Sequence, residues 1–353
     1  MKARLCVTLG LVAPLLASCQ SSSLFNWGQQ RGAECLTRAD LNCEGADLRG
    51  RDLSSVKLEG FNLRGAQLTG SDLSNANLRG ANLSGATLIG TDLESADLQG
   101  ALLQRALLRG ADLESANLSG ADIRDADLEG CDAESAKFIR ANLSNVKFRG
   151  ADLESADFLE AKAIGINLIG ASLGRARLSK ANFSKANLEA TDLGSARLTE
   201  TNLTDANLSL ARLRPRLIPS TTNQAQNKES KTAAADFKSK QNNRADDIVE
   251  ASGLSDDSRA GALMIKTNFT NANLKGADLG NTILYQVNLN RANLTGANLI
   301  GSRWINVTTK GTLCSTSKGK LEDCKQFIPT NQATIKQALS HLNWLKSRPY
   351  PED

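Results

Sequence analysis

Residues 46–50 read Ala-Asp-Leu-Arg-Gly, and this five-residue pattern continues without a slip in register as far as Leu213. The central residue of each unit is Leu except at Ile123, Ala133, Ala163 and four Phe residues, Phe138, Phe148, Phe158 and Phe183. The residue two places before the centre is usually Ala. A period of five fits neither an α-helix nor a flat β-strand, so each unit must turn the chain. The pattern predicts a chain wound around a narrow apolar shaft.

A longer period sets the number of units in one circuit. Asp-Leu-Glu-Ser-Ala occurs at residues 92–96, 112–116 and 152–156, which are offset by multiples of twenty residues. Glycine follows the centres at intervals of ten from Gly50 to Gly130. A circuit of twenty residues keeps both periods in register, whereas fifteen would scatter them. We therefore expect four units per circuit, with glycine serving turns that need a positive φ.

At this point the chain resembles the pentapeptide-repeat family, whose motif is Ala-(Asp/Asn)-Leu-x-x. The resemblance covers residues 44–214 and 267–306 and implies an all-β fold, a right-handed quadrilateral parallel β-helix. The 34 units from Leu48 to Leu213 would make about 8.5 coils. Small centres at Ala133 and Ala163 predict a thinner core, which Phe138 and Phe158 could fill. Fold does not imply function, so the resemblance names no ligand.

The rest of the chain divides around this pattern. Residues 215–262 are polar and without repeats, and they are typical of a disordered insertion. The pattern resumes in residues 263–306, with eight centres from Phe269 to Trp304. These units predict two further coils of the same rod, with the insertion leaving at one corner and Trp304 closing the shaft. Both open ends of a β-helix need caps, which we expect in residues 19–43 and 307–353.

The N-terminus is typical of a lipoprotein signal peptide, residues 1–18. Lys2 and Arg4 precede an apolar run from Leu5 to Leu16, which is too short to span a bilayer. Leu16-Ala17-Ser18-Cys19 resembles the bacterial lipobox, which implies acyl chains on Cys19. The alternative is ordinary cleavage with Cys19 incidental. Gln20 rather than Asp follows the cysteine. By resemblance to enteric lipoproteins, this favours the outer over the inner membrane.

In an exported protein the remaining cysteines are expected to pair. Cys35 and Cys43 lie where the repeats begin, and Cys314 and Cys324 lie beyond their end. Each pair would close a small loop that ties a cap to the rod, whereas a shared metal site would need ligands that are not close by in sequence. Cys131 occupies the small inward position of a repeat and is expected to be a buried free thiol.

One column of the twenty-residue circuit is acidic. It predicts a face that carries Asp72, Asp92, Glu94, Asp112, Glu114, Asp132, Glu134, Asp152 and Glu154. Like charges would then repeat about 4.8 Å apart along the rod. In one interpretation the Asp side chains bind turn amides and the Glu side chains are solvated. In the other, the face binds a basic partner or divalent cations.

Near the C-terminus, Ile335, Ala338, Leu339, Leu342 and Leu345 fall on one side of a predicted helix. We expect this helix to cap the rod. Pairing of two rods, as the resemblance to quinolone-resistance members implies, is the alternative.

The composition argues against several functions. The lone histidine, His341, has no nucleophile placed beside it, and the glycines form no phosphate loop, so we expect no enzyme, cofactor or metal centre. The net charge of +4 and the few aromatic residues give no reason to expect nucleic-acid binding. We therefore expect a non-enzymatic, lipid-anchored envelope protein that faces the periplasm and binds an unknown protein partner. An acidic DNA mimic that binds topoisomerases is the alternative, and export argues against it.

Overall fold

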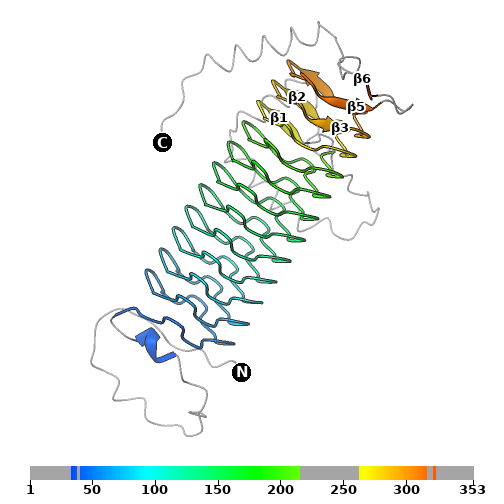
Figure 1. Cartoon of the computed structure of the whole chain (residues 1–353). Coiled ribbons are helices and arrows are strands. Elements are labelled where there is room, and N and C mark those ends of the chain that lie inside the picture. The colour runs from blue at the N-terminus through cyan, green and yellow to red at the C-terminus, as the bar shows by residue number, and fades with distance from the viewer. Residues whose placement is uncertain (1–32, 38–39, 215–261, 316–320, 323–353) are drawn as a thin grey trace, which may run out of the picture.

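The computed structural model describes residues 33–37, 40–214, 262–315 and 321–322, and these residues form a rod of stacked rectangular coils (Figure 1). The 3₁₀-helix η2 (Ala33–Thr37) precedes the first coil. The six named strands all lie in the C-terminal part: β1 (Leu263–Ile265), β2 (Ile283–Tyr285), β3 (Asn293–Leu294), β4 (Arg303–Ile305), β5 (Leu313–Ser315) and β6 (Leu321–Glu322). In the coils that precede β1, each side of a coil contributes a parallel bridge of a single residue.

Each circuit takes twenty residues, as predicted. Asn42 bridges Asn62, Asp47 bridges Gln67, and the same interval holds up to the bridge between Asp192 and Arg212. The amide of Leu48 donates to the carbonyl of Gln67 at 2.8 Å, while the Gln67 amide donates to the carbonyl of Ala46 at 2.9 Å. We name the four faces by their first bridges: first (Asn42), second (Asp47), third (Asp52) and fourth (Lys57).

The central residues form one continuous core. Leu48, Leu68 and Leu88 are fully buried, and so are the small residues that precede the centres, such as Ala66 and Ala86. The thinner places are filled as expected: Phe138 stacks on Phe158 with ring centroids 5.0 Å apart, near Ala133. The residue two places after each centre has a positive φ, +70° at Gly60 and +56° at Ser95. Glycine is favoured at these corners because other residues are strained there.

The second block continues the same rod. The Ala262 amide donates to the Leu213 carbonyl at 2.7 Å, so the insertion leaves and returns at one corner. Arg197 bridges Leu263 across the break, and the twenty-residue interval then resumes. The ladder is longer than predicted, because Met264 is a buried centre before Phe269 and Leu294 pairs with Cys314 beyond residue 306. Trp304 is buried at its inward position.

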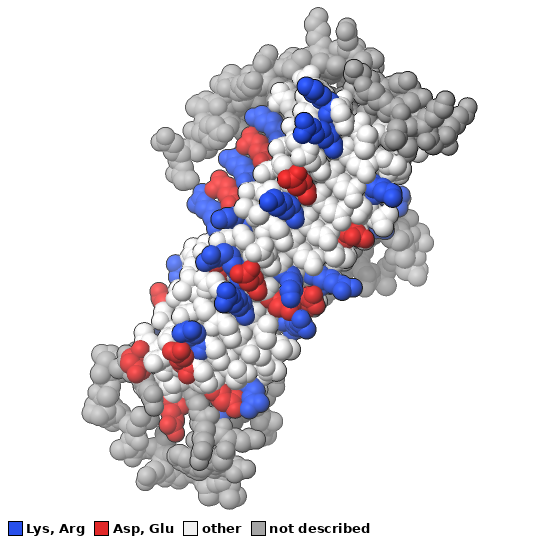
Figure 2. Space-filling view, in the orientation of Figure 1, with Lys and Arg blue, Asp and Glu red and all other residues white. Residues whose placement is uncertain are grey.

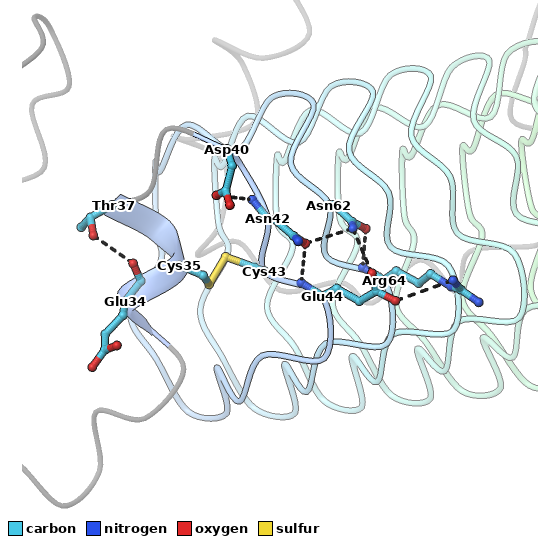
Figure 3. The surroundings of a disulfide bond; sticks show 9 residues. All are labelled: Glu34, Cys35, Thr37, Asp40, Asn42, Cys43, Glu44, Asn62 and Arg64. Carbon is cyan, nitrogen blue, oxygen red and sulfur yellow. Dashed lines mark hydrogen bonds and ion pairs between the residues drawn. A yellow bond between two sulfur atoms is a disulfide. The ribbon is translucent and has the colours of Figure 1, made fainter.

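The described ends are partly capped. The predicted Cys35–Cys43 disulfide is present and ties η2 to the first coil (Figure 3). At the other end β6 pairs antiparallel with β5, a strand reversal that the repeat pattern does not predict. Cys314 is disulfide-bonded, but its predicted partner Cys324 lies outside the described residues. The signal peptide with Cys19, the insertion and the predicted C-terminal helix also lie outside them.

Candidate acidic face on a repeat scaffold

The predicted acidic residues do lie on one side of the rod, the third face. Parallel bridges join Asp72, Asp92, Asp112, Asp132 and Asp152 in successive coils. Each Glu of the set lies two residues after an Asp, on the other side of a buried centre, so its side chain also points outward. We call these nine residues, Asp72, Asp92, Glu94, Asp112, Glu114, Asp132, Glu134, Asp152 and Glu154, the acidic face.

The Asp carboxylates have a local structural role. Oδ1 of Asp92 and of Asp112 each accepts the backbone amide of the Glu two residues later at 3.0 Å. Asp72 accepts both the amide and the hydroxyl of Ser74, at 3.0 and 2.7 Å. These bonds stabilise the turns, as Asp side chains generally do. For the Asp column the local-bonding interpretation is therefore confirmed.

The Glu column differs, because its carboxylates repel one another. Burial, followed by the charges of Glu154, Asp152, Glu114 and Asp132, raises the pKa of Glu134 above its ordinary value. Among the described residues no ion pair neutralises Glu94, Glu114 or Glu134. The middle of the acidic face thus carries uncompensated negative charge.

The acidic face ends where the third face becomes charge-paired. Above Asp152 the column continues with Ser172, and Arg175 pairs with Glu154 at 3.5 Å. Arg212 then pairs with Asp192 at 3.4 Å, and Arg214 with Asp278 at 2.9 Å. The side of the rod visible in Figure 2 likewise interleaves acidic and basic residues. On the third face, the run of Glu side chains without an ion pair therefore ends before Glu154.

The cation interpretation finds no support in the described part of the chain. No group of three or more His, Cys, Asp or Glu side chains there is placed to hold a metal ion. Stacked carboxylates on flat coils diverge from the surface, whereas calcium needs six or more converging oxygens.

A charge-neutral substitution tests the repulsion. Glu134→Gln should raise the melting temperature at pH 7 by a degree or two, because removing one like charge contributes a few tenths of a kcal/mol. The pKa of Glu134 is higher in the folded than in the unfolded state, so its ionised carboxylate opposes folding only at pH values above the unfolded-state pKa. The gain should vanish below about pH 4, where Glu is protonated in both states. Melting followed by circular dichroism at both pH values measures it. Glu200→Gln, which removes the partner of Lys266 at 3.3 Å, should give no gain, and equal gains from both variants would contradict this account.

An ion pair on the second face was not predicted from the repeat pattern. Asp127 is nearly buried, and Arg109 reaches it at 2.6 Å while Lys147 lies 3.9 Å away. Burial alone would raise the pKa of Asp127, but the hydrogen bond from Arg109 and the amide of Glu129 hold it below its ordinary value. The spacing of eighteen residues between Arg109 and Asp127 is the signal for such pairs, and it recurs in Arg79 and Asp97.

Removing this partner should reduce stability in a pH-dependent way. Arg109→Ala should lower the free energy of unfolding modestly at pH 7, since Arg109 is half exposed and solvent screens the pair. A carboxyl with a depressed pKa stabilises the fold above pH 4 and loses that contribution as pH falls below its unfolded value. Urea titrations at pH 7 and pH 2.5 should therefore show a difference from wild type that shrinks in acid. Arg149→Ala, at the same position two coils later, is the matched control; an equal loss there would refute the pairing argument.

A shallow hollow of about 400 Å³ lies on the first face and is lined by Arg64, Gln104, Arg105, Arg124 and Asp125. Arg64 faces Glu44 at 3.6 Å, and Arg124 holds Asp122 at 2.7 Å. Because these charges are balanced, the hollow does not resemble a site for a charged substrate.

The pentapeptide repeats family model matches residues 62–100, 96–132, 136–175, 156–194, 176–214 and 261–303, over half of the chain. The chain belongs to the pentapeptide repeat family. Proteins of this family fold as right-handed β-helices, and the parallel ladder described above agrees with that fold.

Several solved pentapeptide-repeat structures are similar. HetL from Nostoc sp. strain PCC 7120, involved in heterocyst differentiation regulation, is 26% identical over 80% of this chain and 91% of its own, with a TM-score of 0.32. QnrB1, a plasmid-mediated fluoroquinolone resistance protein, is 18% identical over 78% and 93%, with a TM-score of 0.28. The Nostoc protein alr5209 is 42% identical over 30% and 76%, with a TM-score of 0.18. A comparison with curated proteins finds no match.

Within the described ranges, no helix has both the length and the apolar character needed to cross a bilayer.

Proposed function

We infer that this pentapeptide-repeat protein is a non-enzymatic scaffold of the cell envelope, anchored by lipid on Cys19, whose faces bind a protein partner. The observation that carries most weight is the unbroken ladder. From Asn42 to Arg212, residues twenty apart in the sequence lie one above the other on the same face of the rod. Each outward side chain therefore has a fixed position along and around the rod. Such a surface suits an extended partner better than a small substrate.

The anchor rests on the sequence Leu16-Ala17-Ser18-Cys19, and acylation at that cysteine with more than one chain would hold the rod at a membrane stably. The outer membrane, facing the periplasm, is the preferred location because Gln20 follows. A predicted helix in residues 335–345 completes the C-terminal end of this scaffold.

Labelling with radioactive palmitate tests the anchor. The wild type should incorporate label and sediment with membranes, and Cys19→Ala should do neither. Label on the variant equal to that on the wild type, or no label on the wild type, would reject the anchored scaffold. Separation of inner and outer membranes on a density gradient then tests the location.

The acidic face is the stretch that we propose for contact with a basic partner. Chemical cross-linking in isolated membranes, followed by mass spectrometry, would identify that partner. The variant Glu94→Gln/Glu114→Gln/Glu134→Gln should lose it. The matched control Glu129→Gln/Glu189→Gln/Glu200→Gln changes the charge equally on other faces and should retain it. Loss with both variants would mean that net charge, rather than this face, governs the contact.

A further inference from the structure

The fourth face changes character at its C-terminal end. Strands β1, β2 and β4 pair in parallel. Leu263 lies opposite Ile283, and Ile265 lies opposite Tyr285, which in turn lies opposite Ile305. The centres of these strands point into the shaft, so the residues on either side of them point outward. Below β1 the bridge positions of this face are polar, including Asp157, Arg177 and Arg197. We call Leu263, Ile265, Ile283, Tyr285 and Ile305 the apolar ladder.

The apolar ladder is buried although it points away from the core. Leu263 and Ile265 are each 7% exposed, and Ile283 and Tyr285 are each 8% exposed. Apolar residues at equivalent outward positions lower on the rod, Ile89 and Leu102, are 39% exposed. Part of this difference comes from stacking, because the ladder residues pack on one another, whereas Leu102 lies between Asn82 and Asp122 in its column. A further part of this chain lying over the ladder would account for the rest.

The length and pattern of the C-terminal segment suit this role. The last described residue is Glu322 in β6, which lies on the opposite side of the rod from β1 and β2 (Figure 1). The residues between Glu322 and Ile335 can span up to roughly 40 Å, enough to cross the end of a rod one β-helix wide. The segment then presents Ile335, Ala338, Leu339, Leu342 and Leu345 on one helical side.

The insertion is the weaker candidate. Its larger apolar residues are scattered between polar stretches, at Leu217, Ile218, Phe237, Ile248, Val249 and Leu254. They form no continuous helical side comparable in length to residues 335–345.

We propose that the apolar ladder on β1, β2 and β4 is the docking surface for the apolar side of residues 335–345 of the same chain. Residues 323–334 cross the open end of the rod, and the amphipathic segment lies along the fourth face. This arrangement covers the end of the shaft beside Trp304 and shields apolar surface that would otherwise promote association of rods.

Site-specific photocrosslinking on the full-length protein tests the docking. The residue p-benzoylphenylalanine in place of Tyr285 should crosslink within the chain to the tryptic peptides Gln326–Lys336 or Gln337–Lys346. The same group in place of Ile89, an outward residue that also follows its centre, should not. Crosslinks to residues 215–261, crosslinked dimers, or no crosslink to residues 326–346 would each overturn the proposal.

A second variant separates docking from folding. Leu339→Glu/Leu342→Glu should abolish the Tyr285-position crosslink and increase binding of the dye ANS several-fold, while the circular dichroism of the rod stays unchanged. Lys336→Glu/Lys346→Glu, which changes charge but keeps the apolar side, should behave as wild type. Retention of the crosslink in the Leu variant would also overturn the proposal.

Discussion

Phe138→Ala should lower the free energy of unfolding by about 3–5 kcal/mol, the largest effect expected from a single substitution in the rod. Phe138 is fully buried, stacks on Phe158 at 5.0 Å and meets Phe148 edge-on at 5.7 Å. Within its own coil the centre Ala133 is too small to fill the space that the lost ring would leave. The ladder hydrogen bonds above and below also prevent collapse of the backbone.

Urea unfolding followed by circular dichroism measures this loss, provided that the slope with denaturant stays unchanged. Phe138→Leu keeps most of the volume and should lose no more than about 1.5 kcal/mol. A loss below 1 kcal/mol for Phe138→Ala would show that the shaft narrows freely around Ala133, contrary to this packing argument.

The core of this fold was predictable because the repeat carries its own geometry. A buried Leu every fifth residue, together with the twenty-residue recurrence around Asp92, Asp112 and Asp152, leaves four sides per circuit as the consistent solution. The same reasoning placed the Phe residues beside Ala133 and Ala163. Column membership, and hence the acidic face, followed directly from this register.

Features that depend on the break in register were not predictable in the same way. The apolar ladder begins at Leu263, which lies over Arg197 in the preceding coil. The insertion separates these two residues in the sequence and hides their alignment. The bridge between Arg197 and Leu263, together with the turn hydrogen bond from Ala262 to Leu213, reveals it. Met264 as the first resumed centre was missed for the same reason.

Side-chain pairing between coils was also beyond the repeat pattern. Arg109 pairs with Asp127 in the coil above, whereas Arg124 turns to Asp122 in its own unit at 2.7 Å. Both choices satisfy a guanidinium, and rotamers and neighbouring charges decide between them. The reversal of β6 against β5 is likewise an end effect, because only a terminal coil offers an unpaired edge.

The double variant Cys35→Ala/Cys43→Ala should lower stability by about 2–3 kcal/mol, and the loss should be concentrated in the first coil. The disulfide closes a short loop with a sequence separation of eight, which limits the conformations open to the unfolded cap. Cys43 is itself buried, and its amide donates to the Asn62 carbonyl at 2.8 Å. Around it, Glu44 pairs with Arg64 and Asn62 donates to Asn42 (Figure 3).

Solenoid coils contact only their neighbours, so a weakened cap should fray locally before the rod unfolds. Hydrogen exchange in the oxidised wild type and the variant should differ at the amides of Gly45, Leu48 and Leu53, which donate to the second coil, and agree beyond Leu113. Treating the wild type with dithiothreitol should reproduce the variant.

Cys131→Ala is the matched control, because that buried free thiol occupies a position where Ala is usual. Burial raises the pKa of the Cys131 thiol, so it remains protonated and unreactive. Uniform exchange along the whole rod would contradict the cap argument, because it would mean that the first coil opens only when all the others do.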